Sequence, residues 1–370
     1  MKHSFIAITD PGCQEFLKQE LKVRFEVTAS RESFYLAFEE TAVKALEVMY
    51  KSQCLKYLLL KSSSGSFDSL EDLYEKFSSD VFIDSKSFNS SNSDKNVKLL
   101  CERAGSHSFN SQDVMKKLSE KLVNPVVKGE DVKFRVVIND SYFVAGLDIS
   151  GRDLSKRQHK VFNHPGELKG TVGFSALVFA GIDEKPVLDP VALSGVIPIE
   201  AALFHSNVAV NFYNKRFDLE KLGFDLNVGE WLESFDKEIS QSKTVYSLDP
   251  AFKNLSAQKK NAKIAGVEKS ISFSRCNIDY LDVKFHEEKV GAIVTKPLEP
   301  SKRIGDKVAI KNTELLFDRA SKILDGPLVL LARKPEFLDS CEKKGFELVD
   351  EREVWQGEVK YTFLKYKKVV

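Results

Sequence analysis

Residues 188–200 read LDPVALSGVIPIE, an order typical of the corner where a strand of an α/β sheet enters a helix. The strand would end at Asp189, and Ser194 and Gly195 can form the tight turn before the helix. Such a corner lies at the carboxyl ends of the strands, where glycine lets the backbone approach a ligand and the helix N-terminus offers unpaired N–H groups. The residue types therefore predict a cofactor site, although the turn contains a single glycine.

Helices and short apolar strands alternate from about residue 164 onward. This alternation predicts a doubly wound α/β sheet, and a terminal antiparallel hairpin makes the pattern typical of class I methyltransferases. Asp249 would end the second strand, where an acidic side chain accepts hydrogen bonds from the ribose hydroxyls of a cofactor. The expected strands are 186–189, 244–249, 271–276, 290–295 and 326–332, with two more in 346–370.

The first 150 residues mix α and β patterns. Asp10 is a candidate N-cap for the first helix. We expect a strand at 4–8, a helix at 13–21 and a hairpin at 27–38. The same order of elements is expected again, with a strand at 97–103, a helix at 111–122 and a hairpin at 132–149. We therefore expect an N-terminal α+β unit at 1–60, a second α+β module at 61–152 and a Rossmann-like domain with a seven-stranded sheet at 153–370.

The corner resembles the S-adenosylmethionine (SAM) loop DPMCGSGTIPIEAAL of THUMP-domain RNA guanine-N2 methyltransferases. Leu193 replaces the first glycine of that loop, and its side chain would project into space that the cofactor uses. Val196 replaces the threonine. For this motif alone, a βα turn without a ligand is an equally good interpretation. The matching residues are Asp189, Pro190, Ser194, Gly195, Ile197, Pro198, Ile199 and Glu200.

The same resemblance covers roughly residues 95–370. The stretch ERAGSHSFNSQDV (102–114) is similar to a strand–helix junction of archaeal THUMP domains. The stretch GLDISGRDLSKRQHKVFNHPGELKG (146–170) is similar to the family's connection into the catalytic domain. The resemblance implies that residues 61–152 are a THUMP RNA-binding module.

A THUMP module implies a structured RNA as partner, with tRNA as the expected class. A segment at 214–238 instead resembles the ribosomal-RNA branch of the family, so the choice between tRNA and rRNA stays open. Each candidate contact has a plainer alternative, such as a solvated helix face for a lysine pair or a capping role for a histidine. The candidate RNA contacts are Arg103, His107, Lys116, Lys117, Lys156 and Arg157.

Two further positions depart from the family pattern. Asn277 stands where the family has an aspartate facing the adenine amino group, and an amide can still bond adenine. At the end of the fourth strand, the family's Asn/Asp-Pro-Pro-Tyr/Phe accepts hydrogen bonds from the guanine amine and stacks on the base. This chain has Lys296, Pro297, Leu298 and Glu299 there. A charged lysine cannot accept a hydrogen bond, and a glutamate offers no stacking face.

The composition is that of an ordinary globular protein. The 370 residues carry 55 Lys and Arg against 54 Asp and Glu, so any basic surface must be local. Five scattered cysteines without a paired spacing favour neither a disulfide framework nor a metal site, and we expect no metal. No apolar run is long enough for a membrane span, so we expect a cytoplasmic protein with no membrane partner.

We therefore expect a structured-RNA-binding member of this family with a degenerate catalytic site that binds SAM weakly or not at all. The alternative is an active SAM-dependent tRNA or rRNA (guanine-N2) methyltransferase. The sequence leaves open whether a protein partner supplies the missing groups.

Overall fold

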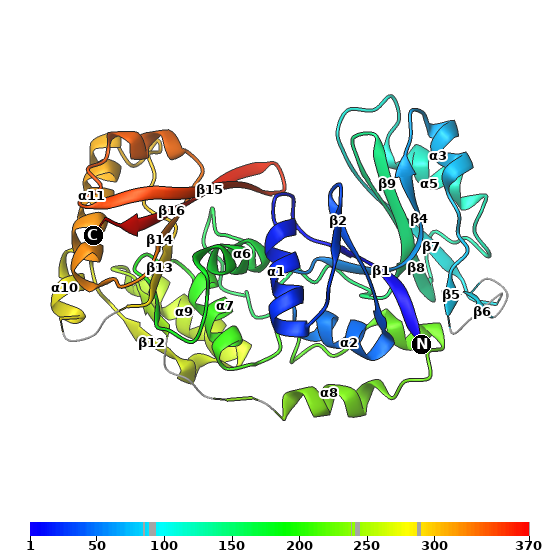
Figure 1. Cartoon of the computed structure of the whole chain (residues 1–370), viewed down its shortest axis with the longest axis horizontal. Helices are drawn as coiled ribbons and strands as arrows, with labels where there is room; N and C mark the ends of the chain where they lie inside the picture. Colours follow the sequence, from blue (N-terminus) through cyan, green and yellow to red (C-terminus); the bar gives the residue numbers. More distant parts are fainter. Residues whose placement is uncertain (84–85, 89–93, 238, 241–244, 287–289, 370) are drawn as a thin grey trace. The chain divides into compact units, whose positions relative to one another are not determined.

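The computed structural model describes residues 1–83, 86–88, 94–237, 239–240, 245–286 and 290–369. These residues form two compact units (Figure 1). Each unit includes a short segment whose sequence neighbours belong to the other unit. Unit 1 comprises Met1–Thr9, Lys18–Leu154 and Asn214–Phe235, and unit 2 comprises Asp10–Leu17, Ser155–Tyr213 and Asp236–Val370.

Unit 1 is built on one seven-stranded sheet in the order β2-β3-β1-β4-β9-β8-β7. Its strand pairs are antiparallel except for β7 and β8, which are parallel. The hairpins expected within 27–38 and 132–149 are confirmed. The strands are β1 (Lys2–Ile8), β2 (Ser30–Glu32), β3 (Tyr35–Thr41), β4 (Tyr57–Ser66), β7 (Val97–Ala104), β8 (Val132–Asn139) and β9 (Tyr142–Asp148).

The sheet of unit 1 continues across residue 60, because β4 pairs with β1 on one side and with β9 on the other. A separate two-stranded ribbon is formed by β5 (Phe82–Ile83) and β6 (Lys86–Ser87). The helices are α1 (Gln14–Phe25, shared between the units), α2 (Ala42–Lys51), α3 (Leu70–Lys76), α5 (Ser111–Ser119), the 3-10 turn η1 (Asp218–Leu222) and α8 (Val228–Asp236).

Unit 2 contains the seven-stranded doubly wound sheet expected from the sequence, in the order β12-β11-β10-β13-β14-β16-β15. The first five strands are parallel, and the terminal hairpin is antiparallel. The strands are β10 (Val187–Asp189), β11 (Val245–Leu248), β12 (Ile271–Ser274), β13 (Ala292–Thr295), β14 (Leu328–Ala332), β15 (Phe346–Gln356) and β16 (Val359–Lys368).

The topological switch point of this sheet lies at β10, which pairs with β11 on one side and with β13 on the other. In open α/β sheets, ligands bind at the carboxyl ends of the strands beside such a point. The helices of unit 2 are α6 (Gly170–Ala180), α7 (Val196–His205), α9 (Phe252–Ala265), α10 (Leu281–Lys284) and α11 (Asp306–Ile323). The 3-10 turns are η2 (Glu268–Ser270), η3 (Ile278–Tyr280) and η4 (Pro335–Ser340).

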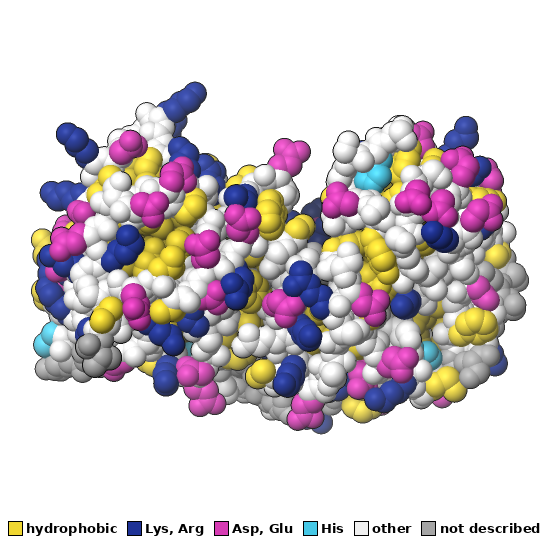
Figure 2. Space-filling model, turned by 45° about the horizontal axis from the view of Figure 1, so that its top comes forward, with side chains coloured by type: hydrophobic (Ala, Val, Ile, Leu, Met, Phe, Trp, Pro, Cys, Tyr) yellow, Lys and Arg dark blue, Asp and Glu magenta, His cyan; other side chains and the backbone are white. Residues whose placement is uncertain are grey.

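Burial explains why the central strands of unit 2 read as continuous apolar runs. Every residue of β10, β13 and β14 is buried, as expected for parallel strands covered on both faces. Every residue of α6 is buried as well. On the face shown in Figure 2, acidic and basic side chains are interspersed, in keeping with the balanced charge. Among the described residues, no helix has the length and apolar character needed to cross a membrane.

Asp10 does not cap the first helix, which begins later, at Gln14. Its buried carboxylate instead accepts hydrogen bonds from Lys169 Nζ (2.8 Å) and Thr171 Oγ1 (2.5 Å), at the start of α6. The expectation of an N-cap was wrong because these long-range partners are invisible to a local pattern.

Candidate cofactor site

Asp189 ends β10 at the switch point and is buried. Its Oδ1 accepts hydrogen bonds from Thr295 Oγ1 (2.6 Å), at the end of β13, and from Val191 N (3.1 Å). Burial raises the pKa of Asp189 to about 7, and the nearby Asp249 also raises it. The carboxyl group therefore links β10 to β13.

Leu193 occupies the left-handed region of backbone space, with φ at +52°. This conformation suits glycine and costs a residue with a side chain about 1–2 kcal/mol. Its N–H donates to Asp249 Oδ2 (3.1 Å), and its carbonyl accepts from Gln258 Nε2 (3.0 Å). Residue 193 thus has a backbone conformation that glycine favours, although it is a leucine. Both its N–H and its carbonyl are hydrogen-bonded to side chains of the chain.

Asp249 follows β11 and is 1% exposed. Oδ1 accepts from Ala251 N (2.8 Å) and Asn254 Nδ2 (3.0 Å), and Oδ2 accepts from Leu193 N (3.1 Å) and the same Asn254 Nδ2 (3.1 Å). A carboxylate has about four acceptor positions. Three donor groups of the chain, one of them shared between both oxygens, surround this buried carboxylate, so a ribose hydroxyl could reach Asp249 only by displacing a group of the chain.

Gly195 begins α7 with φ at +93° and lies against α9. A Cβ at this position would lie 3.2–3.4 Å from Gln258, which is fully buried. The side-chain amide of Asn261 donates to Ser194 O (3.1 Å). The glycine is therefore explained by the close approach of α9, without a ligand.

Three side-chain amides of α9 hold this corner and were not predicted from the sequence: Asn254, Gln258 and Asn261. They are spaced four and three residues apart, which places them on one face of a helix. Gln258 and Asn261 are buried. The sequence did offer a signal for them, because uncharged polar residues occupy helix positions that lie on the buried face.

The remaining corner residues differ in accessibility. Asn277 follows β12 and is exposed, and its carbonyl accepts from Tyr280 N. Ser194 is buried, and its hydroxyl has no hydrogen-bond partner among the described residues. It lines a cavity of about 10 Å³ together with Arg157, Glu200 and Asn261. A cavity of this size holds about one water molecule, which could satisfy the hydroxyl.

The four residues after β13 form contacts within unit 2. Lys296 Nζ donates to Gly166 O (2.7 Å), and burial lowers the pKa of this ammonium group. Glu299 Oε1 accepts from the backbone N–H groups of Arg333 and of Lys334 (3.2 Å). The first position is therefore a donor, and the carboxylate at the fourth is bonded by the backbone after β14.

Pro297 is buried and Leu298 is half-buried, and neither carries a polar side-chain group. A guanine amine needs acceptors, and among the four side chains only the Glu299 carboxylate provides them. Its Oε1 is bonded by the backbone, and its Oε2 lies 3.7 Å from Arg333 Nε. The first of the four positions thus carries a donor, and the acceptors at the fourth are partly engaged within unit 2.

The candidate RNA contacts are divided between the two units. In unit 1, His107 stacks on Phe67 with ring centroids 6.0 Å apart, and its nitrogens contact Arg103 Nη1 and Asp140 O, each at 2.7 Å. Lys116 is exposed on α5, and Lys117 Nζ lies 4.9 Å from the centre of the Tyr74 ring. His107 therefore contributes to local packing, which leaves its remaining surface small.

In unit 2, Lys156 is exposed, whereas Arg157 is buried. Arg157 Nε and Nη2 lie 2.7 and 3.1 Å from the two carboxylate oxygens of Glu200, on α7. This two-point ion pair occupies the face of the guanidinium that a phosphate would need. Of the two residues, only Lys156 is accessible to RNA.

The strand order of unit 2, its terminal antiparallel hairpin and the polar corner at the switch point define a class I methyltransferase fold. Residues 157–362 match the family model described as UPF0020: RMKL-like, methyltransferase domain. The match covers more than half of the 370 residues, and the chain belongs to this family.

The similarity to known proteins extends beyond the residues of that domain. The tRNA (guanine(6)-N2)-methyltransferase of Methanocaldococcus jannaschii is 31% identical over 279 residues, covering 69% of this chain and 71% of that protein. The protein of the same name from Archaeoglobus fulgidus is 28% identical over 380 residues, covering 95% and 89%. The structure of SMU.472 complexed with SAH has a TM-score of 0.79 at 14% identity, covering 100% and 99%, which shows the fold alone.

Proposed function

We propose that this chain binds structured RNA and does not itself transfer a methyl group to guanine N2. The observation that carries the proposal is the buried carboxylate of Asp249, which is 1% exposed and accepts hydrogen bonds from Leu193, Ala251 and Asn254. The residue expected to hold the ribose of a cofactor is thus engaged by its own chain.

SAM is the cofactor that the family implies, and the complex of SMU.472 with SAH supports this for the fold. The corner of this chain fits SAM poorly at three places. Asp249 is buried beneath three donor groups of its own chain, Leu193 adds a side chain at the glycine position, and Gln258 packs against Gly195. We therefore assign no reaction step through this cofactor.

The base-binding side supports the same conclusion. Methyl transfer to an exocyclic amine requires acceptors that orient the nitrogen and a surface that stacks on the flipped base. Lys296 supplies a donor instead, and the Glu299 carboxylate is bonded to two backbone N–H groups. This chain departs from the family pattern on both the cofactor side and the base side. Loss of catalysis explains departures on both sides better than neutral change at a single position does.

Both relatives described above are named tRNA methyltransferases, and the similarity to the Archaeoglobus fulgidus protein spans nearly the full length of both chains. This supports an RNA partner, with tRNA favoured over rRNA. The THUMP module that the sequence resemblance implies for residues 61–152 remains part of the proposal. The proposed contacts are Arg103, Lys116 and Lys117 of unit 1 and Lys156 of unit 2, with His107 positioning Arg103.

The second candidate function is an active SAM-dependent RNA (guanine-N2) methyltransferase. The names of the relatives and the family membership favour it. It requires that the loop around Leu193 and the helix α9 rearrange when SAM binds, because the Asp249 carboxylate must exchange at least one of its present donors for a ribose hydroxyl.

Gel-shift titration of the full chain with a tRNA and with an unstructured RNA of equal length tests the RNA proposal. We expect tighter binding to the tRNA, and weaker binding with a smaller salt dependence for Arg103→Glu and Lys156→Glu. Lys76→Glu is the matched control, because Lys76 already pairs with Asp72 at 2.9 Å. Equal binding to both RNAs, or none, would overturn the proposal. Methyl transfer by the wild-type chain would establish the second candidate.

A further inference from the structure

We propose that the exposed face of α9 in unit 2 is a second RNA-binding surface, contacting the phosphate backbone through Lys253, Lys259, Lys260 and Lys263. This inference rests on the proposed RNA binding and adds a surface outside the contacts named so far. The four lysines are all exposed. We refer to them as the α9 basic face.

Helix geometry places these lysines together. At about 100° per residue, the four side chains fall within an arc of about 120°. The opposite arc holds the buried residues that pack against the sheet and the corner loop: Leu255, Gln258, Asn261, Ala262 and Ala265. The lysines therefore project from one side of the helix, and the helix itself is held in place by its buried side.

No acidic residue occurs between Pro250 and Val267, so the helix has no internal ion-pair partner for its lysines. Within the described residues, no carboxylate pairs with any of the four. Some other exposed lysines of unit 2 do have acidic partners: Lys360 pairs with Glu353 at 2.8 Å and Lys344 with Glu342 at 3.3 Å. In a chain of net charge +1, four adjacent uncompensated cations form a local field suited to a polyanion.

Exposed aromatic side chains accompany the cations, which favours single-stranded or looped RNA over an acidic protein as the occupant. Phe162 is 39% exposed, and Lys260 Nζ lies 4.7 Å from the centre of its ring. Its backbone is fixed to α9, because Asn261 bonds both Phe162 N and Phe162 O at 3.0 Å. Phe252, the first residue of the helix, is 70% exposed. Aromatic faces beside cations stack unpaired bases while the cations contact phosphates.

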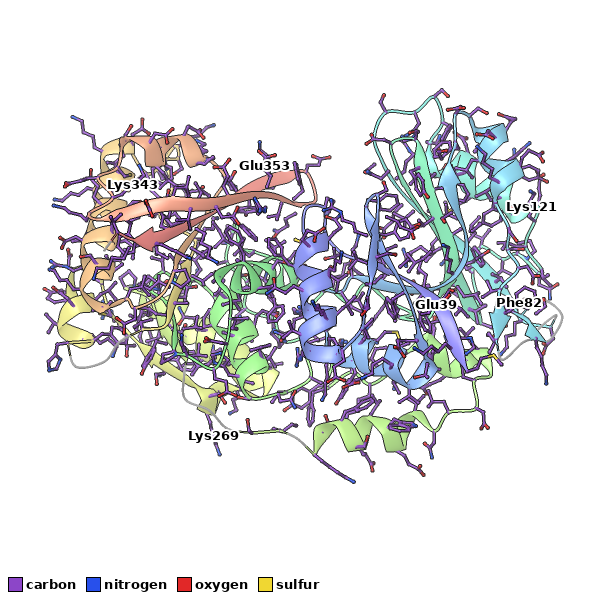
Figure 3. All side chains as sticks on the ribbon, viewed as in Figure 1. Glu39, Phe82, Lys121, Lys269, Lys343 and Glu353 are labelled. Atoms are coloured by element: carbon purple, nitrogen blue, oxygen red, sulfur yellow. The ribbon has the colours of Figure 1, made fainter. Side chains whose placement is uncertain are left out.

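The turn after the helix carries both signs of charge, because Glu268 and Lys269 are both exposed there. Lys269, in η2, points away from the body of unit 2, whereas Glu353 lies on β15 of the terminal hairpin (Figure 3). The hairpin therefore offers control positions on a different part of the same unit.

Binding of the full chain to tRNA at several salt concentrations tests the inference. The variant Lys253→Gln/Lys260→Gln/Lys263→Gln keeps a polar, unbranched side chain and the helix propensity but removes three charges. The control Lys185→Gln/Lys344→Gln/Lys360→Gln removes three charges that already pair with acidic residues. Thermal melts should show that both fold.

We expect the α9 variant to bind tRNA at least about tenfold more weakly at moderate salt, with the slope of log affinity against log salt reduced by about 2–3. The control should retain the wild-type slope. Phe162→Leu should weaken binding severalfold without changing the slope, because it removes stacking and no charge; unchanged affinity would remove Phe162 from the surface. If the wild-type chain binds tRNA and the α9 variant matches it, this inference alone fails; if the wild-type chain does not bind, the proposed function fails with it.

Discussion

The side-chain amide of Asn254 donates to both carboxylate oxygens of Asp249, at 3.0 and 3.1 Å. The backbone N–H groups of Leu193 and Ala251 bond the same carboxylate. A ligand can reach Asp249 only when one of these groups moves away. These hydrogen bonds support the proposal that the corner resembling a SAM loop is held in a closed arrangement by contacts within the chain.

Opening this arrangement should restore cofactor binding. Asn254→Ala frees two acceptor positions of Asp249, and Leu193→Gly removes the side chain at the glycine position. We expect the double variant to bind SAM with a Kd tighter than about 1 mM in titration calorimetry. It should still not methylate RNA, because Lys296, Leu298 and Glu299 remain; activity requires converting them toward Asn-Pro-Pro-Tyr as well.

Asn312 provides the control for the opened corner, because its amide donates to Val308 O on α11. Asn312→Ala combined with Leu193→Gly should not gain the affinity of the Asn254 variant. If neither pair binds SAM, something other than Asn254 and Leu193 closes the corner.

The left-handed backbone conformation of Leu193 predicts an effect on the free energy of unfolding that does not depend on any ligand. Because φ is +52°, glycine relieves a strain of about 1–2 kcal/mol that alanine retains. We expect Leu193→Gly to unfold at higher denaturant concentration than Leu193→Ala, by a free-energy difference of about 1 kcal/mol. This reverses the usual order of the two residues. An alanine variant that is the more stable would show that residue 193 leaves this conformation in solution.

Asp189 should make the protein less stable as the pH rises. Its pKa is about 7 in the folded chain against an ordinary value of 3.8, so between about pH 4 and 7 the folded state keeps a proton that the unfolded state has lost. The unfolding free energy contributed by this group therefore falls across that window. Asp189→Asn keeps an acceptor for Thr295 and Val191, removes the decline and raises stability at pH 8 by up to ~4 kcal/mol.

Urea unfolding from pH 4 to 8 measures this effect. Asp279→Asn, at an exposed aspartate in η3, is the control and should follow the wild-type profile. If Asp189→Asn leaves the slope with pH unchanged, the Asp189 carboxyl is already ionised at low pH and its burial is not penalised.

The buried pair of Arg157 and Glu200 should be strongly coupled. Both side chains are nearly inaccessible, at 2% and 1%, so removing one partner leaves a buried charge uncompensated. We expect Arg157→Met or Glu200→Leu to cost about 3–5 kcal/mol each, and the double variant to cost less than the sum. Denaturant unfolding of the four proteins gives the coupling energy. Additive losses would show that the two groups do not depend on one another.

The strands of unit 2 could be predicted from the sequence, because buried parallel strands give continuous apolar runs that are visible locally. The strands expected at 186–189 and 290–295 correspond to β10 and β13, and the corner at Asp189 lies where the alternation placed it. Its chemistry could not be predicted in the same way. The partners of Asp249 come from three positions, and the Thr295 partner of Asp189 lies 106 residues away.

The assignment of segments to units was also beyond local patterns. Asn214–Phe235 lies between α7 and β11 in sequence, yet it belongs to unit 1, where Leu219 N donates to Ile149 O and Lys133 Nζ lies 3.4 Å from Asp218 Oδ2. Nothing in the periodicity of 214–238 specifies the sheet against which it packs. Such contacts follow from tertiary structure and need coordinates.

Titration calorimetry of the wild-type chain with SAM tests most directly whether the corner at Asp249 and Leu193 is closed. The hydrogen bonds around Asp249 predict no saturable heat at SAM concentrations up to about 1 mM. Stoichiometric binding with a Kd near 10 μM, an affinity of about −7 kcal/mol, would contradict it and show that α9 yields to the cofactor.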